Sequence, residues 1–118
     1  LRDVYKRQLV NQVVLVGEVT DRPFRPGNGN RTVVKIRVTR SGTAYDHFEF
    51  DAFGQPGEFG IKLHVGDLIA IHGRLEDRTF TEDGAEVSET RIVAQFIELL
   101  TKGTQRRPDD RPSRDDQS

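Results

Sequence analysis

Apolar and polar residues alternate along much of this chain, and the alternation predicts a β-rich domain. In Thr32–Arg40, valine or isoleucine occupies alternate positions, with Lys35, Arg37 and Thr39 between them. Tyr45–Phe53 repeats the pattern with aromatic residues. Because successive side chains of a strand point to opposite faces, each segment is expected to bury one face. In the second segment Phe48, Phe50 and Ala52 are predicted inward, and Tyr45, His47, Glu49, Asp51 and Phe53 outward.

Three further segments are predicted as strands. Gln12–Val19 is rich in β-branched residues, and Leu68–Phe80 and Val87–Leu100 are long runs on either side of a turn at Asp83–Gly84. Asp21–Asn30, which holds two prolines and two glycines among its first nine residues, is predicted to be a loop. The residues assigned to the core are Phe48, Phe50, Ile69 and Ile71.

Between the third and fourth strands the pattern becomes weakly helical. Gln55–Val65 has Pro56 at a preferred first helical position, and Phe59 and Leu63 lie four residues apart on one predicted face. Gly66 follows at a position where helices commonly end. Glycines inside the segment weaken this prediction, so only a short helix is expected.

The resulting order of elements, β-β-β-α-β-β, is typical of a small Greek-key barrel. We therefore predict an all-β, five-stranded OB-fold with one short helix between strands 3 and 4. Gly17 and Gly73 interrupt two of the strands, at points where a closed sheet has to bend and crowding is greatest. Closure would also remove the exposed sheet edges that favour aggregation.

The two ends of the sequence are expected to lie outside this barrel. Residues 1–8 (LRDVYKRQ) show no period and are interpreted as a non-native or flexible segment. Residues 104–118 contain no apolar side chain and are expected to form a disordered polar tail. The domain is therefore predicted to span residues 9–103.

Composition and charge restrict the classes of function that this chain can have. The chain has no cysteine, which excludes disulfides and thiolate metal sites, and it has no apolar run long enough to span a membrane, so a cytoplasmic location is the default. Residues 9–103 hold 11 basic and 14 acidic residues, a net charge of −3. Nucleic-acid binders normally present a basic face, so such a function would require a local basic stripe.

Five sequence blocks together resemble the bacterial and phage single-stranded DNA-binding proteins. They are NQVVLVG at Asn11–Gly17, FDAFG at Phe50–Gly54, VGDLIAIHGRL at Val65–Leu75, EDRTFTEDG at Glu76–Gly84 and TRIVA at Thr90–Ala94. The resemblance implies an OB-fold, sequence-nonspecific binding of single-stranded DNA in replication, recombination or repair, and a homotetramer. Neither a membrane nor a small-molecule substrate is predicted as a partner.

The same resemblance suggests individual binding residues. Phe53 and Phe80 stand where family members keep aromatic residues that stack on bases, His47 where many have tryptophan, and Gln12 where many have a basic residue. This chain departs from the pattern because it has no tryptophan, and because the predicted outward face of strand 3 carries Glu49 and Asp51.

The strand pattern alone adds cations to this candidate site. Lys35 and Arg37 share the outward face of strand 2, and Arg74 and Arg78 share a face with Phe80 on strand 4. Aromatic rings for bases and cations for phosphates are what a single-strand track requires. Simpler alternatives remain at each position. Phe80 could be buried in the hairpin, and Phe53 could cap the core. Arg37 and Arg74 could pair with Glu49, Asp51 or Glu76 across strands.

Catalysis is not expected. His47, His64 and His72 lack the spacing of metal ligands, and no phosphate-binding glycine loop or nucleophile–base pair is evident. No cofactor and no metal are therefore predicted. The main alternative to DNA binding is an OB module that binds a protein partner and has lost most of its DNA affinity, as the acidic body suggests. RNA or an oligosaccharide is a third class of ligand for this fold.

Overall fold

A computed structural model describes residues 10–103, and it has the predicted order of elements. The strands are β1 (Val13–Val19), β2 (Thr32–Ser41), β3 (Ala44–Ala52), β4 (Leu68–Glu82) and β5 (Ala85–Thr101), and the helix α2 (Gly54–Gly60) lies between β3 and β4. The segments predicted to lie outside the barrel, residues 1–8 and 104–118, fall outside the described residues. No helix among residues 10–103 is long and apolar enough to cross a membrane.

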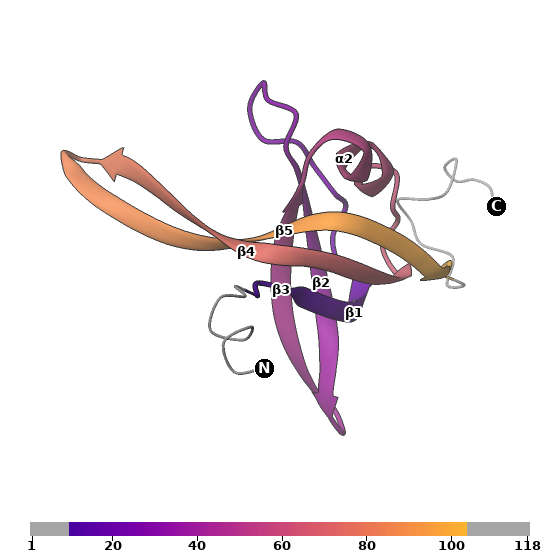
Figure 1. The fold of residues 1–118 in the computed structure, drawn as a ribbon. Helices are drawn as coiled ribbons and strands as arrows, with labels where there is room; N and C mark the ends of the chain where they lie inside the picture. Colours follow the sequence, from indigo (N-terminus) through magenta and orange to yellow (C-terminus); the bar gives the residue numbers. More distant parts are fainter. Residues whose placement is uncertain (1–9, 104–118) are drawn as a thin grey trace, which may run out of the picture.

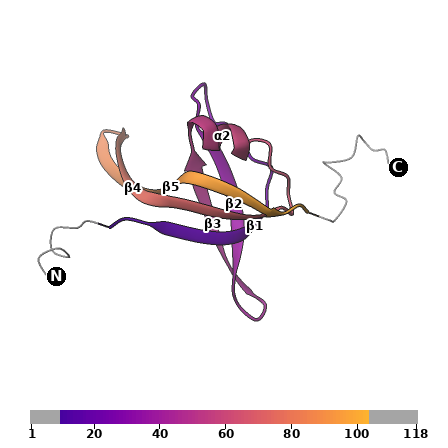
Figure 2. The same ribbon diagram turned by 45° about the vertical axis from the view of Figure 1, so that its right-hand side comes forward.

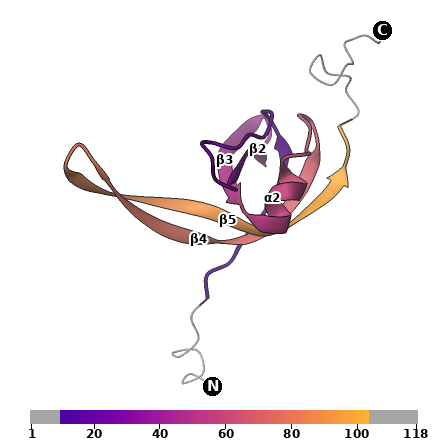
Figure 3. The ribbon, with the colours of Figure 1, turned by 90° about the horizontal axis from the view of Figure 1, so that it is seen from above.

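The strands form a closed barrel in the order β1-β2-β3-β5-β4, which confirms the predicted OB-fold (Figure 1). Neighbouring strands are antiparallel except β3 and β5. This parallel pairing is short, because it joins only Phe50, Asp51 and Ala52 to Ile92, Val93 and Ala94. From above, the strands form a ring, and α2 lies over the end of the barrel that faces up in Figure 1 (Figures 1 and 3). The β4–β5 hairpin extends well beyond the barrel as a curved arm (Figures 1 and 3).

The core follows the predicted alternation at most positions, but not at Phe48. Phe50, Ile69 and Ile71 are completely buried, as expected. Phe48 was assigned to the core, but 36% of its surface is exposed, so that prediction is wrong. Phe48 pairs with the buried Ile36 on β2, but β3 meets β5 only from Phe50 onward. Within the described residues, the other edge of β3 is therefore unpaired at Phe48, which leaves its side chain partly exposed.

Gly17 and Gly73 lie where the barrel walls approach most closely, as predicted. A Cβ atom at Gly73 would stand 2.1 Å from the carbonyl oxygen of Val93 on β5, and one at Gly17 would stand 2.6 Å from that of Arg37 on β2. Both distances are far inside van der Waals contact, so only glycine allows these backbones to approach one another.

The helix is shorter than predicted. It ends at Gly60, so Phe59 and Leu63 do not share a helical face, and Phe59 is exposed whereas Leu63 is buried. The chain then turns into β4 around Asp67, a buried carboxylate. Its oxygens accept hydrogen bonds from the backbone N–H groups of His64 (2.9 Å) and Gly103 (2.8 Å). Asp67 therefore fixes both the start of β4 and the end of β5.

Candidate nucleic-acid interface

Two of the predicted aromatic residues lie beside arginines on the outer surface of the barrel. Phe80, on the part of β4 that continues past the barrel into the arm, is 42% exposed. The guanidinium carbon of Arg78 lies 5.6 Å from the centre of the Phe53 ring, a cation–π distance. Phe80 projects into a hollow of about 300 Å³, which we call the Phe80 hollow. Its lining residues are Arg31, Arg78, Thr79, Phe80, Glu89 and Arg91.

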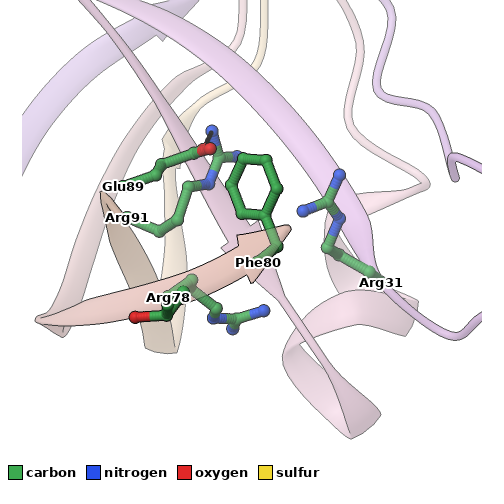
Figure 4. Close-up of a pocket in the computed structure, with 6 residues that line it drawn as sticks. Arg31, Arg78, Phe80, Glu89 and Arg91 are labelled. Carbon is green, nitrogen blue, oxygen red and sulfur yellow. Dashed lines mark hydrogen bonds and ion pairs between the residues drawn. The ribbon is translucent and has the colours of Figure 1, made fainter. Parts of the chain in front are cut away.

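The close-up in Figure 4 shows the Phe80 ring with Arg31 on one side and Arg91 on the other. Arg31 immediately precedes β2, whereas Arg91 comes from β5. Residues far apart in sequence thus surround a single ring. The hollow combines one flat apolar surface with three guanidinium groups, which suits a ligand that has both a planar ring and negative charge.

Sequence reasoning did not assign a role to Arg91, the most strongly bonded cation of this surface. Its Nε donates to Asp51 (3.0 Å) and its Nη1 to Glu49 (2.9 Å) and Glu89 (3.2 Å). The hydrogen bond to Asp51 is the main reason that the pKa of Arg91 is raised further above its ordinary value. The parallel pairing of β3 with β5 brings these groups together, and no local sequence pattern predicts that pairing.

Asp51 lies on the outward face of β3, as predicted, but it is completely buried rather than exposed. Arg91 covers it, and Nη1 of Arg31 lies 3.6 Å from its Oδ2. The acidic face expected on strand 3 is therefore largely neutralised. A buried carboxylate needs such partners, because an unpaired charge in the interior is costly.

Arg74 and Arg78 do share the face of β4 on which they were predicted, together with Glu76. Arg74 Nη2 donates to Glu76 Oε2 (2.6 Å) and Arg78 Nη2 donates to Glu76 Oε1 (3.3 Å). The hydrogen bond from Arg74 is the main cause that lowers the pKa of Glu76. The structure thus has the alternative considered for Arg74, an ion pair with Glu76.

The remaining predicted cations lie on a second part of the surface, the outer face of β2 and β3. Arg37 donates to Glu18 (2.9 Å) and its guanidinium carbon lies 4.4 Å from the Tyr45 ring centre, while Lys35 Nζ lies 3.9 Å from Asp21. Lys35 and the exposed His47 line a separate hollow of about 400 Å³. Neither part of the surface includes Gln12, which is exposed just before β1.

Glu49 connects the two parts of this surface. It lines the second hollow beside Lys35 and His47, and it accepts a hydrogen bond from Arg91 of the Phe80 hollow. The structure therefore brings Phe53, Arg78 and Phe80 together and leaves Lys35, Arg37 and His47 as a neighbouring group. Among residues 10–103, no three His, Asp or Glu side chains come together in a group that could hold a metal ion.

OB-fold proteins bind extended ligands such as oligonucleotides on the outer face of the barrel. Exposed aromatic rings beside arginines, as found here, are typical of those that bind single strands. The profile of the Single-strand binding protein family matches residues 10–100, so the chain belongs to this family. A single-stranded DNA-binding protein of Thermus aquaticus is 30% identical over 103 residues, covering 77% of this chain and 39% of that protein. The chain thus spans well under half the length of this relative.

Solved structures agree with the fold. A small single-stranded DNA-binding protein from Streptomyces coelicolor matches with a TM-score of 0.59 at 22% identity, over 78% of this chain and 96% of that one. A mitochondrial single-stranded DNA binding protein from S. cerevisiae matches with a TM-score of 0.64 at 16% identity, over 81% of this chain and 100% of that one. At these identities the likeness supports the shared barrel and nothing finer.

Proposed function

We propose that this protein binds single-stranded DNA without sequence preference, in DNA replication, recombination or repair, and that it has no catalytic activity. The observation on which this rests is the exposed Phe80 ring among Arg31, Arg78 and Arg91, next to the Arg78–Phe53 pair. Any base can stack on an aromatic ring, so such a surface discriminates little between sequences. This ligand also implies a cytoplasmic, nucleoid-associated location.

The two chemical parts of a nucleotide would have separate partners on this surface. Bases stack on Phe80 and Phe53, and each stacked base contributes roughly 1–3 kcal/mol. Phosphates contact Arg78 and Arg74, while Lys35, Arg37, His47 and Gln12 extend the track over the neighbouring faces. Because bound phosphates release counterions, affinity is expected to fall steeply with salt.

The test is fluorescence anisotropy of labelled oligo-dT with the full chain over a salt series. Phe80→Ala removes the proposed stacking surface and should weaken binding about tenfold, which corresponds to one lost stacking contact. Phe59→Ala is the matched control, because Phe59 is exposed to the same extent (41% against 42%) but lies on α2 and does not line the Phe80 hollow. Equal affinities for both variants would remove Phe80 from the interface.

A second candidate function is supported by the charge of this surface. Arg74, Arg78 and Arg91 each already have a carboxylate partner, and residues 9–103 carry a net charge of −3. An OB module with these properties could instead serve a protein partner. A folded protein that leaves oligo-dT anisotropy unchanged at low salt would favour this role, and an RNA competitor in the same assay tests the preference for DNA.

We further propose a homo-oligomer, a tetramer as the family resemblance suggests. Within the described residues, β1 pairs with β2 only at Glu18 and Val19, so its earlier residues, although paired with β4, have an open edge. The outer face beside that edge exposes Val14, Val16 and Phe96, and Figure 2 shows no other described element across β1 there. An open strand edge next to an apolar face favours pairing with a second copy.

A further inference from the structure

Of the three arginines that line the Phe80 hollow, Arg31 makes the fewest hydrogen bonds and ion pairs within the described part of the protein. Its side chain is 36% exposed, and its nearest carboxylate contact, Nη1 to Asp51 Oδ2, is 3.6 Å. This separation is longer than a hydrogen bond. Among residues 10–103 the Arg31 side chain makes an ion pair with Asp51 and no hydrogen bond, although a guanidinium group has five N–H donors.

The reason is that Asp51 is already occupied by another arginine. Arg91 donates Nε to Asp51 Oδ2 and Nη2 to Asp51 Oδ1, so it binds both carboxylate oxygens. This two-point geometry is the strongest that an arginine and a carboxylate can form. Asp51 therefore neutralises Arg91 and holds Arg31 near the hollow, but leaves most of the hydrogen-bonding capacity of Arg31 unused.

The other two cations of the hollow differ from Arg31 in this respect. Arg91 is bonded to three carboxylates, and Arg78 is bonded to Glu76. A phosphate that approached either of them would have to displace a carboxylate, whereas at Arg31 it would displace solvent. Arg31 also lines the same hollow as Phe80, so one nucleotide can reach both.

We propose that Arg31 binds the phosphate of the nucleotide whose base stacks on Phe80. The volume of the hollow, about 300 Å³, is at the lower end of the ~300–1,000 Å³ typical of ligand sites, which leaves room for one nucleotide unit. The inference rests on the proposed function, because it assumes single-stranded DNA as the ligand. It adds a residue from the end of the β1–β2 loop, which the strand alternation does not identify.

The test compares Arg31→Gln with Lys102→Gln in oligo-dT anisotropy over a salt series, using the full chain. Both variants lose one positive charge, but Lys102 lies just after β5, at the opposite end of that strand from the Phe80 hollow. Arg31→Gln should lower affinity about tenfold at low salt, the effect of one lost charge-assisted contact. It should also reduce the slope of log affinity against log salt by about 0.7, the value for one single-strand phosphate.

A third variant separates a phosphate contact from a general charge effect. Arg31→Lys keeps the charge and should retain the salt slope, but lose part of the affinity because the planar fork is gone. Equal slopes for Arg31→Gln and wild type, with Phe80→Ala still weakened, would overturn this inference and leave the proposed function standing. No binding by the folded wild type would overturn both. Circular dichroism of each variant checks that the fold is intact.

Discussion

At the scale of single residues, Glu76 binds arginines that we propose as phosphate contacts. Its carboxylate accepts hydrogen bonds from Arg74 and Arg78, two of the three arginines predicted to contact DNA. The hydrogen bond from Arg74 is the main cause that lowers the pKa of Glu76. Glu76 is therefore ionised at neutral pH. Each phosphate that binds these arginines must therefore displace Glu76, which weakens the gain from the contact.

Replacing this carboxylate should increase DNA affinity. Glu76→Gln frees Arg74 and Arg78, so we expect a several-fold tighter complex with oligo-dT and a salt slope that is steeper by about 0.7 for each arginine that gains a phosphate. The control is Glu86→Gln, which makes the same charge change near the tip of the β4–β5 arm. An equal increase in both variants would show that only overall charge matters.

The lowered pKa of Glu76 gives the same residue a pH dependence. As the pH falls through that pKa, the carboxylate is protonated and loses its hold on Arg74, so the affinity of the wild type for DNA should rise. Glu76→Gln has no such group and should lack this rise in the same anisotropy titration. A rise of equal size in Glu76→Gln would assign the effect to another group.

At the scale of elements, closure of the barrel depends on the short pairing of β3 with β5. Arg91 links these two strands through Asp51 and Glu49, next to their three backbone pairs. Asp51 is completely buried, so its charge has to be compensated from within the protein. Arg91 also lines the Phe80 hollow. The same side chain therefore stabilises the barrel and helps to shape the site.

Loss of Arg91 should destabilise the barrel strongly. Arg91→Leu leaves Asp51 buried without its main partner, and we expect the free energy of unfolding to fall by about 3 kcal/mol in urea denaturation. Adding Asp51→Asn should recover much of that loss, because no buried charge then remains. Arg40→Leu serves as the control, since Arg40 pairs with Asp46 at an exposed site and such pairs contribute about 1 kcal/mol or less. Equal losses for Arg91→Leu and Arg40→Leu would contradict this role.

At the scale of the whole molecule, local sequence patterns predicted the strands and their order, but not the length of the helix. Alternation fixed the strands, and the glycines marked the close approaches at Gly17 and Gly73. Phe48 was misplaced because its burial depends on where β5 joins β3, which is a non-local contact. Arg31 and Arg91 were missed for the same reason, since only the folded barrel brings the end of a loop and the last strand to the same ring.

The folded arrangement also accounts for the acidic charge of the domain. The segment from Thr81 to Thr90 spans the tip of the arm and the part of β5 that leads back to the Phe80 hollow. It holds Glu82, Asp83 and Glu86 near the tip, Glu89 beside the hollow, and no basic residue. The rest of residues 9–103 then has 11 basic and 10 acidic side chains. The acidic excess is thus concentrated on the arm, and a strand of DNA that lies across the barrel can bind without following the hairpin to its tip.

The apolar face of β1, β4 and β5 leads to the final prediction. Val14, His72 and Phe96 lie opposite one another across these three strands, and the Phe96 and His72 rings are 5.9 Å apart. If a second copy covers this face, Val16→Glu should break the assembly, because it would bury an unpaired carboxylate there. Phe24→Glu is the control, since Phe24 is similarly exposed (45% against 47%) but lies in the β1–β2 loop.

Sedimentation equilibrium at micromolar concentration provides the measurement. Wild type and Phe24→Glu should have a multiple of the 13.4 kDa chain mass, and Val16→Glu should approach that mass itself. Dissociation should also weaken the binding of long oligo-dT more than that of short, because linked barrels raise the effective concentration of each next contact. A wild type that already sediments at 13.4 kDa would contradict the oligomer, and its affinity would then have to come from the Phe80 hollow and the neighbouring β2–β3 face of a single barrel.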